Sequence, residues 1–401
     1  MQVHSSSNPY KKIVSGSLLV AGTAIGAGML GIPMVTGNAG FIPATLITIL
    51  VWAFMLTTGL LLLEVTLKMK PGSNILSITE KYFGKSGKIF AGIMFVFLYY
   101  CLIVAYIAGG SPLIESLLTN FNIHAIPTSL YYIFFTVVIA IVVYTGVKWI
   151  DRINIVLSLA MFTAYILMFV SGAHAISNDR LLDTALFGEM FFAVPILFGA
   201  FGYHNVVPSL CDYLRRDKKS LQLSLIIGTT LALLIYLVWQ YLVIGSIDAK
   251  ALTHAMKSGQ TTISALQEAT NRPSLYLFGR WFGMLALLTS LLGVSLSMCD
   301  FFADGFRHIS VHLNRFWLCC ITFIPPLVFT LFNPAVFTKA LGIAGGIGES
   351  ILNGLLPVAL IWVSKYILQN QTKAHSFHKL LLCFLFILGI AVIGIEIYNL
   401  S

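Results

Sequence analysis

Eleven apolar segments dominate this chain of 401 residues, and each is long enough to cross a lipid bilayer as a helix. A spanning α-helix needs about 20 mainly apolar residues. The predicted spans are 13–35, 41–67, 89–112, 129–147, 153–175, 187–211, 221–246, 275–303, 315–332, 336–367 and 378–399. In the tenth span, four glycines (342, 345, 346 and 348) also allow part of the segment to be re-entrant. The sequence therefore predicts an all-α, polytopic membrane protein that forms a single transmembrane domain over residues 1–401.

The composition excludes a soluble protein. Hydrophobic residues make up 58% of the chain and charged residues only 10%, whereas soluble domains carry about 25% charged residues. A soluble surface needs those charges, so most of this surface must face lipid.

The net charge of +9 is distributed unevenly among the loops. Basic residues gather before the first span and after the second, fourth, sixth, eighth and tenth spans, and they include Lys11, Lys12, Lys68, Lys70, Lys81, Lys85, Lys88, Arg215, Arg216, Lys218 and Lys219. The loops on the other side of the membrane hold few basic residues. This bias is the positive-inside pattern of an inner-membrane protein, and it argues against a nucleic-acid partner. It places the N-terminus in the cytoplasm and, with eleven spans, the C-terminus in the periplasm.

Two of the predicted spans contain clusters of glycine and proline at mid-membrane depth. They are residues 22–33 (GTAIGAGMLGIP) in the first span and 195–208 (PILFGAFGYHNVVP) in the sixth. Both residue types are poor helix formers, and backbone that leaves the helix inside a bilayer must be satisfied by other groups. Broken helices at matching places in two halves are typical of a transporter's binding site.

Five spans separate the two breaks, so the second half enters the membrane from the opposite side. This predicts an inverted repeat of helices 1–5 (about 13–175) and 6–10 (about 187–367), with an extra helix at about 378–399. An alternative stays open for the first break, since Gly22, Gly26 and Gly28 can serve only close helix packing. That alternative does not explain the matching break in the sixth span.

Several short motifs resemble one family. They are 22–30 (GTAIGAGML), 61–65 (LLLEV), Phe198-Gly199 with His204 and 207–209 (VPS), 245–248 (GSID), and 289–294 (TSLLGV) with Asp300 and Asp304. Together they resemble the bacterial aromatic amino acid permeases, and most of all the tyrosine-specific transporters. That family belongs to the amino acid–polyamine–organocation superfamily and has the LeuT-type fold.

The resemblance implies a secondary active transporter that imports an aromatic L-amino acid, tyrosine first, by proton symport and without a cofactor. A sodium-coupled transporter, or one with broader specificity for neutral amino acids, is the alternative. The sequence does not favour an enzyme, because it has no HExxH motif and Asp300 and Asp304 share one helix face. The apolar faces also argue against a channel, and the scarcity of ligands in the breaks argues against a metal site.

An amino acid substrate has a carboxylate and an ammonium group, and both must find partners when they leave water. A broken helix exposes N–H groups at one new end and C=O groups at the other. We expect the carboxylate at the amides of Gly26, Ala27 and Gly28, where the helix dipole favours an anion. We expect the ammonium at carbonyl groups near Thr23, Ala24, Phe198 and Gly199.

Aromatic side chains near the breaks are candidates for the substrate's side-chain pocket. They are Tyr100, Tyr106, Phe198, Phe201 and Tyr203, with Phe201 favoured because it lies in the sixth-span break. Ordinary membrane-helix composition is the competing explanation, since 13% of the chain is aromatic.

Candidates for ion coupling are polar groups inside or near the spans. His204 can carry a proton or bind the substrate, and Glu64 is an acid near the inner end of the second span. Thr289 and Ser290 are hydroxyls where the LeuT-type fold can bind sodium, although such hydroxyls often bond their own backbone. Asp300 and Asp304 can pair with Arg307 or line an inner gate. The fifth span has no lysine of the kind that replaces sodium in some proton-coupled relatives.

Overall fold

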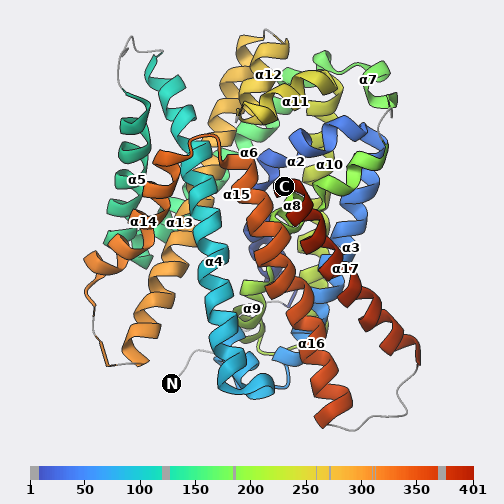
Figure 1. Cartoon of the computed structure of the whole chain (residues 1–401), viewed down its shortest axis with the longest axis vertical. Coiled ribbons are helices and arrows are strands. Elements are labelled where there is room, and N and C mark those ends of the chain that lie inside the picture. The colour runs from blue at the N-terminus through green and yellow to red at the C-terminus, as the bar shows by residue number, and fades with distance from the viewer. Residues whose placement is uncertain are drawn as a thin grey trace.

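The chain forms a bundle of long helices in the computed structural model (Figure 1). The structure describes residues 9–119, 127–183, 187–258, 260–270, 272–308, 310–311, 313–368 and 376–401. Ten helices in these ranges are each long and apolar enough to cross a membrane, and a bent pair of helices makes an eleventh candidate span. The prediction of eleven spans is confirmed.

The first five spans lie in the N-terminal part of the chain. Its elements are α1 (Pro9–Ala24), α2 (Gly28–Thr36), η1 (Gly37–Ala39), α3 (Phe41–Thr66), α4 (Ile75–Thr119), α5 (Thr128–Thr145), α6 (Val147–Gly172), η2 (Ala173–Ala175) and α7 (Asn178–Leu182). The element α4 begins before the third predicted span, in the polar stretch before residue 89, and a kink at Gly84, where φ is 68°, separates this first segment from the long helix that follows.

The remaining spans follow in the same order as predicted. Their elements are η3 (Phe187–Ala193), α8 (Val194–Ala200), η4 (His204–Val206), α9 (Val207–Tyr213), α10 (Lys218–Ser246), α11 (Ala249–Lys257), α12 (Thr262–Thr270), α13 (Pro273–His308), α14 (Arg315–Phe332), α15 (Phe337–Ile343), η5 (Ala344–Leu355), α16 (Leu356–Trp362), η6 (Val363–Leu368) and α17 (Ser376–Leu400).

The tenth span is continuous, so the suggestion that part of it is re-entrant is wrong. Residues 337–368 form one helical segment that is long and apolar enough to cross a membrane, and the glycine-rich stretch η5 has π-helical geometry. A π-helix keeps its backbone groups bonded within the segment, as the bilayer requires. The glycines serve packing instead: a Cβ at Gly345 would overlap the Pro195 carbonyl of α8.

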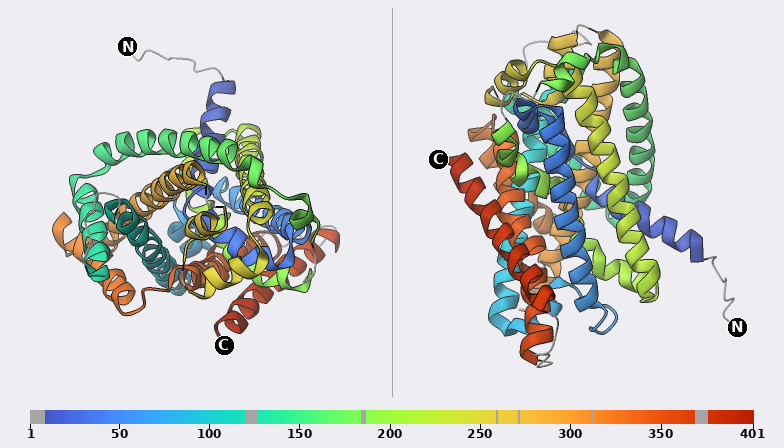
Figure 2. Two further views of the ribbon diagram at one scale, coloured as in Figure 1. Left: turned by 90° about the horizontal axis from the view of Figure 1, so that it is seen from above. Right: turned by 90° about the vertical axis from the view of Figure 1, so that its right-hand side faces the viewer.

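The two ends of the bundle differ in how well they are covered. Figure 1 places α7, α11 and α12 at one end, and α9 with the start of α4 at the other. Between the two ends, α1 packs against α10 and projects outward from the side of the bundle (Figure 2), and large apolar side chains along it, such as Val14 and Leu18, are each 57% exposed. The α11–α12 end is therefore covered by short helices, whereas the helices spread apart at the end with α9 and the start of α4 (Figure 1), which we call the splayed end.

Candidate functional site

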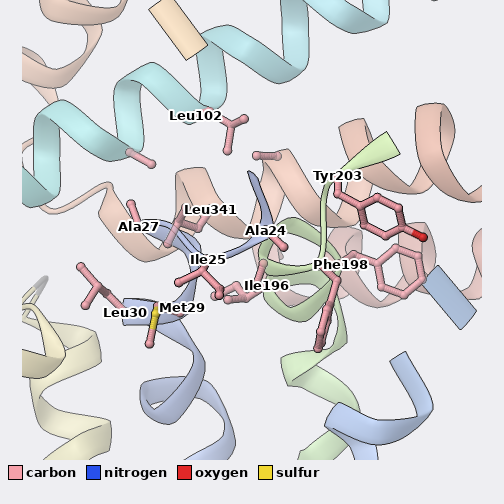
Figure 3. Packing of buried hydrophobic residues seen from close by; sticks show 14 of the residues in the cluster. Ala24, Ile25, Ala27, Met29, Leu30, Leu102, Ile196, Phe198, Tyr203 and Leu341 are labelled. Carbon is pink, nitrogen blue, oxygen red and sulfur yellow. The ribbon is translucent and has the colours of Figure 1, made fainter. Parts of the chain in front are cut away.

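The first span is broken at Ile25, Gly26 and Ala27. Helical geometry stops at Ala24 and resumes at Gly28, and the helix axes on the two sides differ by 59°. Glycine at 26 and 28 lowers the cost of leaving the helix at this depth. Figure 3 shows this non-helical stretch passing close beside α8 of the sixth span.

The sixth span is broken at Phe201, Gly202 and Tyr203, between α8 and the short turn η4. Pro195 and Pro208 stand near the starts of α8 and α9, where a missing N–H is tolerated. The two breaks touch, because a Cβ at Gly28 would lie only 3.1 Å from Ala200 Cα. Both breaks that the sequence predicts are present, and they lie next to each other.

Polar side chains from neighbouring helices bond the backbone groups exposed by the breaks. The Tyr236 hydroxyl of α10 lies 2.6 Å from the Ala24 carbonyl oxygen and 2.7 Å from that of Ala200, so one hydroxyl bridges the carbonyl ends of both half-helices. On the amide side, Ala27 N–H donates to Ser290 Oγ of α13 at 3.0 Å. The two types of backbone end are thus adjacent and already hydrogen-bonded.

A cavity of about 1250 Å³ reaches both breaks. Its lining extends to Gly72 and Ser73, in the turn before α4 at the splayed end of the bundle. At the other end, the Thr262 hydroxyl of α12 donates to the Leu30 carbonyl, and Met29 and Leu30 are fully buried. The cavity therefore opens towards the splayed end and is sealed at the α11–α12 end.

Eight of the predicted site residues line this cavity. They are Thr23, Ala24, Gly26, Gly28, Tyr106, Gly199, Thr289 and Ser290. The Thr23 and Thr289 hydroxyls donate to the backbone of their own helices, at 2.8 and 3.1 Å. A Cβ at Gly26 would overlap the Ser290 hydroxyl, so the glycines of the first break also serve close packing.

The other substrate-site candidates lie outside the cavity lining. Ala27 is buried against Ser290, and the Tyr100 hydroxyl donates to the Ile321 carbonyl of α14 at 2.8 Å. The Phe198 ring packs on that of Phe54, with 5.0 Å between ring centroids.

The remaining aromatic candidates in the sixth span face neighbouring helices. The Phe201 ring lies edge-on to the ring of Tyr236, at 4.9 Å. The Tyr203 hydroxyl donates to the Met55 carbonyl at 3.2 Å, and His204 Nε2 lies 3.0 Å from the Thr58 hydroxyl. In this conformation these residues hold the broken helix against its neighbours.

The acidic candidates lie at the splayed end of the bundle. The Glu64 carboxylate is 3.0 Å from Lys365 Nζ and 3.4 Å from Lys68 Nζ. Asp304 is 3.9 Å from Arg307, and both side chains are 71% exposed. The expected Asp304–Arg307 pairing is present, and Glu64 is ion-paired outside the cavity lining.

Sequence reasoning missed two residues at the breaks. Tyr236 could not be identified from the sequence, because a single tyrosine in an apolar helix does not show which groups its hydroxyl contacts. Glu349, which lines the cavity, did carry a signal: it is an acid inside a predicted span, and such residues are functional candidates by default.

Comparisons with known proteins agree with this geometry. The profile of the tryptophan/tyrosine permease family matches residues 10–396. The "Tyrosine-specific transport system 1" of Haemophilus influenzae is 32% identical over 389 residues, covering 96% of both chains. The "Low affinity tryptophan permease" of Escherichia coli (strain K12) is 30% identical and covers 94% of this chain and 93% of its own.

A solved structure, MhsT in complex with L-phenylalanine, superposes with a TM-score of 0.69 at 15% identity, covering 96% of this chain and 98% of its own. That similarity supports the fold alone, which is the LeuT-type fold implied by the sequence motifs. Family profile, relatives and fold together show that the chain is a transport protein, not an enzyme, and that it belongs to the tryptophan/tyrosine permease family.

Proposed function

We propose that this chain imports an aromatic L-amino acid, tyrosine first, by proton symport and alternating access. The observation that carries the proposal is one cavity that reaches both helix breaks, where the carbonyl and amide ends of the half-helices meet. The names of the relatives, which are tyrosine and tryptophan transporters, support the substrate class. Within the single domain of residues 1–401, we assign the two repeats to about 13–175 and 187–367.

We place the substrate's charged ends at the two kinds of backbone end. The carboxylate would bind the amides of residues 26–28 at the start of α2, where the helix dipole favours an anion. The ammonium would bind carbonyls near Ala24 and Gly199. Ser290 and Tyr236, which now bond Ala27 and Ala24, would share these backbone groups with the substrate.

The substrate's ring would lie against the cavity wall formed by α4. Tyr106 is the predicted pocket residue that both lines the cavity and is aromatic. An offset or edge-on ring pair contributes about 0.5–1.5 kcal/mol beyond area burial. The rings of Phe198, Phe201 and Tyr203 lie behind the break, so their proposed role in this conformation is to support it.

We place the N-terminus in the cytoplasm and the C-terminus in the periplasm of a bacterial inner membrane. Arg215, Arg216, Lys218 and Lys219 lie at the end of the bundle where the cavity opens, and a basic excess marks the cytoplasmic side. With this orientation, the structure represents an inward-facing state.

Reporter fusions test this orientation. A reporter fused after Asp217 is expected to lie in the cytoplasm, and one inserted near Lys257, at the end of α11, in the periplasm. Enzymatic reporters active on only one side of the membrane measure both. Two reporters on the same side would contradict the orientation and the inverted repeat.

The alternative function is sodium-coupled transport, or transport of a broader range of neutral amino acids. The observation that favours sodium is the placement of Thr289 and Ser290 beside the first break, with Ser290 Oγ 3.0 Å from Ala27 N. We propose the proton first because the sequence motifs resemble a family of proton symporters.

Uptake into proteoliposomes distinguishes these possibilities. Labelled tyrosine, tryptophan, phenylalanine and leucine are offered under an imposed proton or sodium gradient. We expect tyrosine to accumulate with the proton gradient, by up to about tenfold per pH unit for one proton per substrate, and leucine not to accumulate. Accumulation of tyrosine that follows sodium alone, or equal uptake of leucine, would favour the alternative.

A further inference from the structure

A buried acid lies where the cavity meets the break of the sixth span. Glu349 of η5 is 6% exposed and lines the cavity. Its carboxyl group presses on the backbone of the break, because a Cβ at Gly202 would lie 2.5 Å from Glu349 Oε1 and 2.8 Å from Cδ. A side chain at position 202 would therefore displace this carboxyl group.

Glu349 has an amide partner and no cationic one. The Asn353 side-chain amide donates to Glu349 Oε2, and none of the ion pairs between described residues involves Glu349. An ionised carboxylate without a counter-charge is costly at low dielectric, whereas the protonated acid is not. The amide donor can bond the acid in either state, so the site tolerates a change of protonation.

The titratable side chains on the elements packed against η5 that line the cavity with Glu349 are Tyr99 and Tyr106 of α4, and neither can become cationic. Basic side chains also lie on these elements, but none of them lines the cavity: Lys81, Lys85, Lys88, Lys339, His378 and Lys379. His204, two positions after Gly202, bonds Thr58 of α3 through Nε2. Asp212, the other acid in the cavity lining, is 3.6 Å from Arg216. Glu349 is thus the cavity acid without a counter-ion among the described residues.

We propose that Glu349 carries the coupled proton. This inference rests on the proposed proton symport and deepens it by naming the group. The carboxyl group takes one proton from water when the site faces the periplasm, holds it while the cavity is closed and dry, and releases it to water when the cavity opens towards the splayed end. Because the carboxyl group lies on Gly202, movement of the broken sixth span changes its solvation, which links proton release to the step that frees the substrate.

Glu349→Gln, in which a neutral amide of similar shape replaces the carboxyl group, separates coupling from transport. We expect the variant to lose proton-driven accumulation of tyrosine at least about tenfold, which corresponds to 1.4 kcal/mol, while counterflow exchange without a gradient persists. Tyrosine binding to the wild type should weaken as pH rises, and binding to the variant should not depend on pH. Proteoliposome uptake and equilibrium binding measure both effects.

Glu396→Gln is the matched control. Glu396 is also a buried acid in a spanning helix, at 2% exposure, and it packs on Gly342 and Gly346 of the same tenth span, outside the cavity lining. We expect it to accumulate tyrosine and to show wild-type pH dependence. Equal loss of coupling in both variants would overturn the inference.

Two further results would also overturn it. One is Glu349→Gln accumulating tyrosine like the wild type. The other is Glu349→Gln that melts normally but neither binds nor exchanges tyrosine, because the carboxylate would then bind the substrate's ammonium. If Glu349→Gln does not fold, Glu349→Asp replaces it: its binding should stay pH-dependent with a shifted midpoint, and an unchanged midpoint contradicts the proposal. If the proposed proton symport is itself wrong, the wild type will accumulate tyrosine to the same extent with and without a proton gradient.

Discussion

Tyr236→Phe is expected to lower tyrosine affinity and transport at least about fivefold. The hydroxyl bridges the Ala24 and Ala200 carbonyls and is fully buried. Its loss leaves two buried acceptors without this donor, at about 1–3 kcal/mol for an unsatisfied group. Without this hydroxyl, the two half-helix ends whose carbonyls would bind the ammonium are also no longer held at a fixed distance from each other. Equilibrium binding and counterflow of labelled tyrosine on the purified variant measure the effect.

Tyr165→Phe provides a matched control for this prediction. The Tyr165 hydroxyl also donates to a backbone carbonyl of α10, that of Ile235 at 2.9 Å, but both residues lie outside the cavity lining. Both variants are expected to melt at a lower temperature than the wild type, and only Tyr236→Phe should bind tyrosine more weakly. Similar affinities in the two variants would show that the Tyr236 hydroxyl supports the fold and not the site.

The spans and the two breaks could be predicted because they depend on local chemistry. The length of an apolar run fixes whether it can cross a bilayer, and glycine and proline mark where a helix is weak. The rotation of each helix could not be predicted in this way. Residues facing lipid and residues facing protein are equally apolar, so the sequence does not show that Tyr100 faces α14 while Tyr106 faces the cavity.

The contacts that complete the site come from distant parts of the chain. Ser290 reaches Ala27 across 263 positions, and Tyr236 reaches Ala24 across 212. Such pairs depend on how helices pack, which local sequence does not encode. The glycines of the tenth span suggested that the helix is interrupted there. In the structure the helix is continuous, and the glycines allow α8 to pack closely against it. That close packing brings Glu349, on the same helix, to the sixth-span break.

Gly28→Val is expected to reduce tyrosine affinity at least about tenfold. A Cβ here would lie 3.1 Å from Ala200 Cα and 3.5 Å from Ala200 N, and backbone atoms cannot move aside as a flexible side chain can. The added side chain also covers the amides at the start of α2. Losing one hydrogen bond to a charged group costs roughly 1.5–3 kcal/mol, and about 1.4 kcal/mol is a factor of ten. Equilibrium binding of labelled tyrosine to the purified variant measures the loss.

Gly26 separates substrate binding from packing at the same break. Its Cβ would overlap Ser290 Oγ, while Ser290 Cβ lies at an ordinary 3.6 Å. In the double variant Gly26→Val with Ser290→Ala, the overlap with the hydroxyl is removed. If glycine serves only packing, the double variant should recover both melting temperature and affinity. We expect it to recover part of the melting temperature and little of the affinity.

The most direct test of the site is tyrosine affinity measured together with melting temperature on purified Gly28→Val and Gly22→Val. Gly22 lines the same cavity in the same span, but no atom outside its local helix lies within 4 Å of its Cβ position. We expect Gly22→Val to bind tyrosine like the wild type and Gly28→Val to bind it at least about tenfold more weakly while remaining folded. Normal affinity in a destabilised Gly28→Val protein would contradict the assignment of the helix breaks as the substrate site.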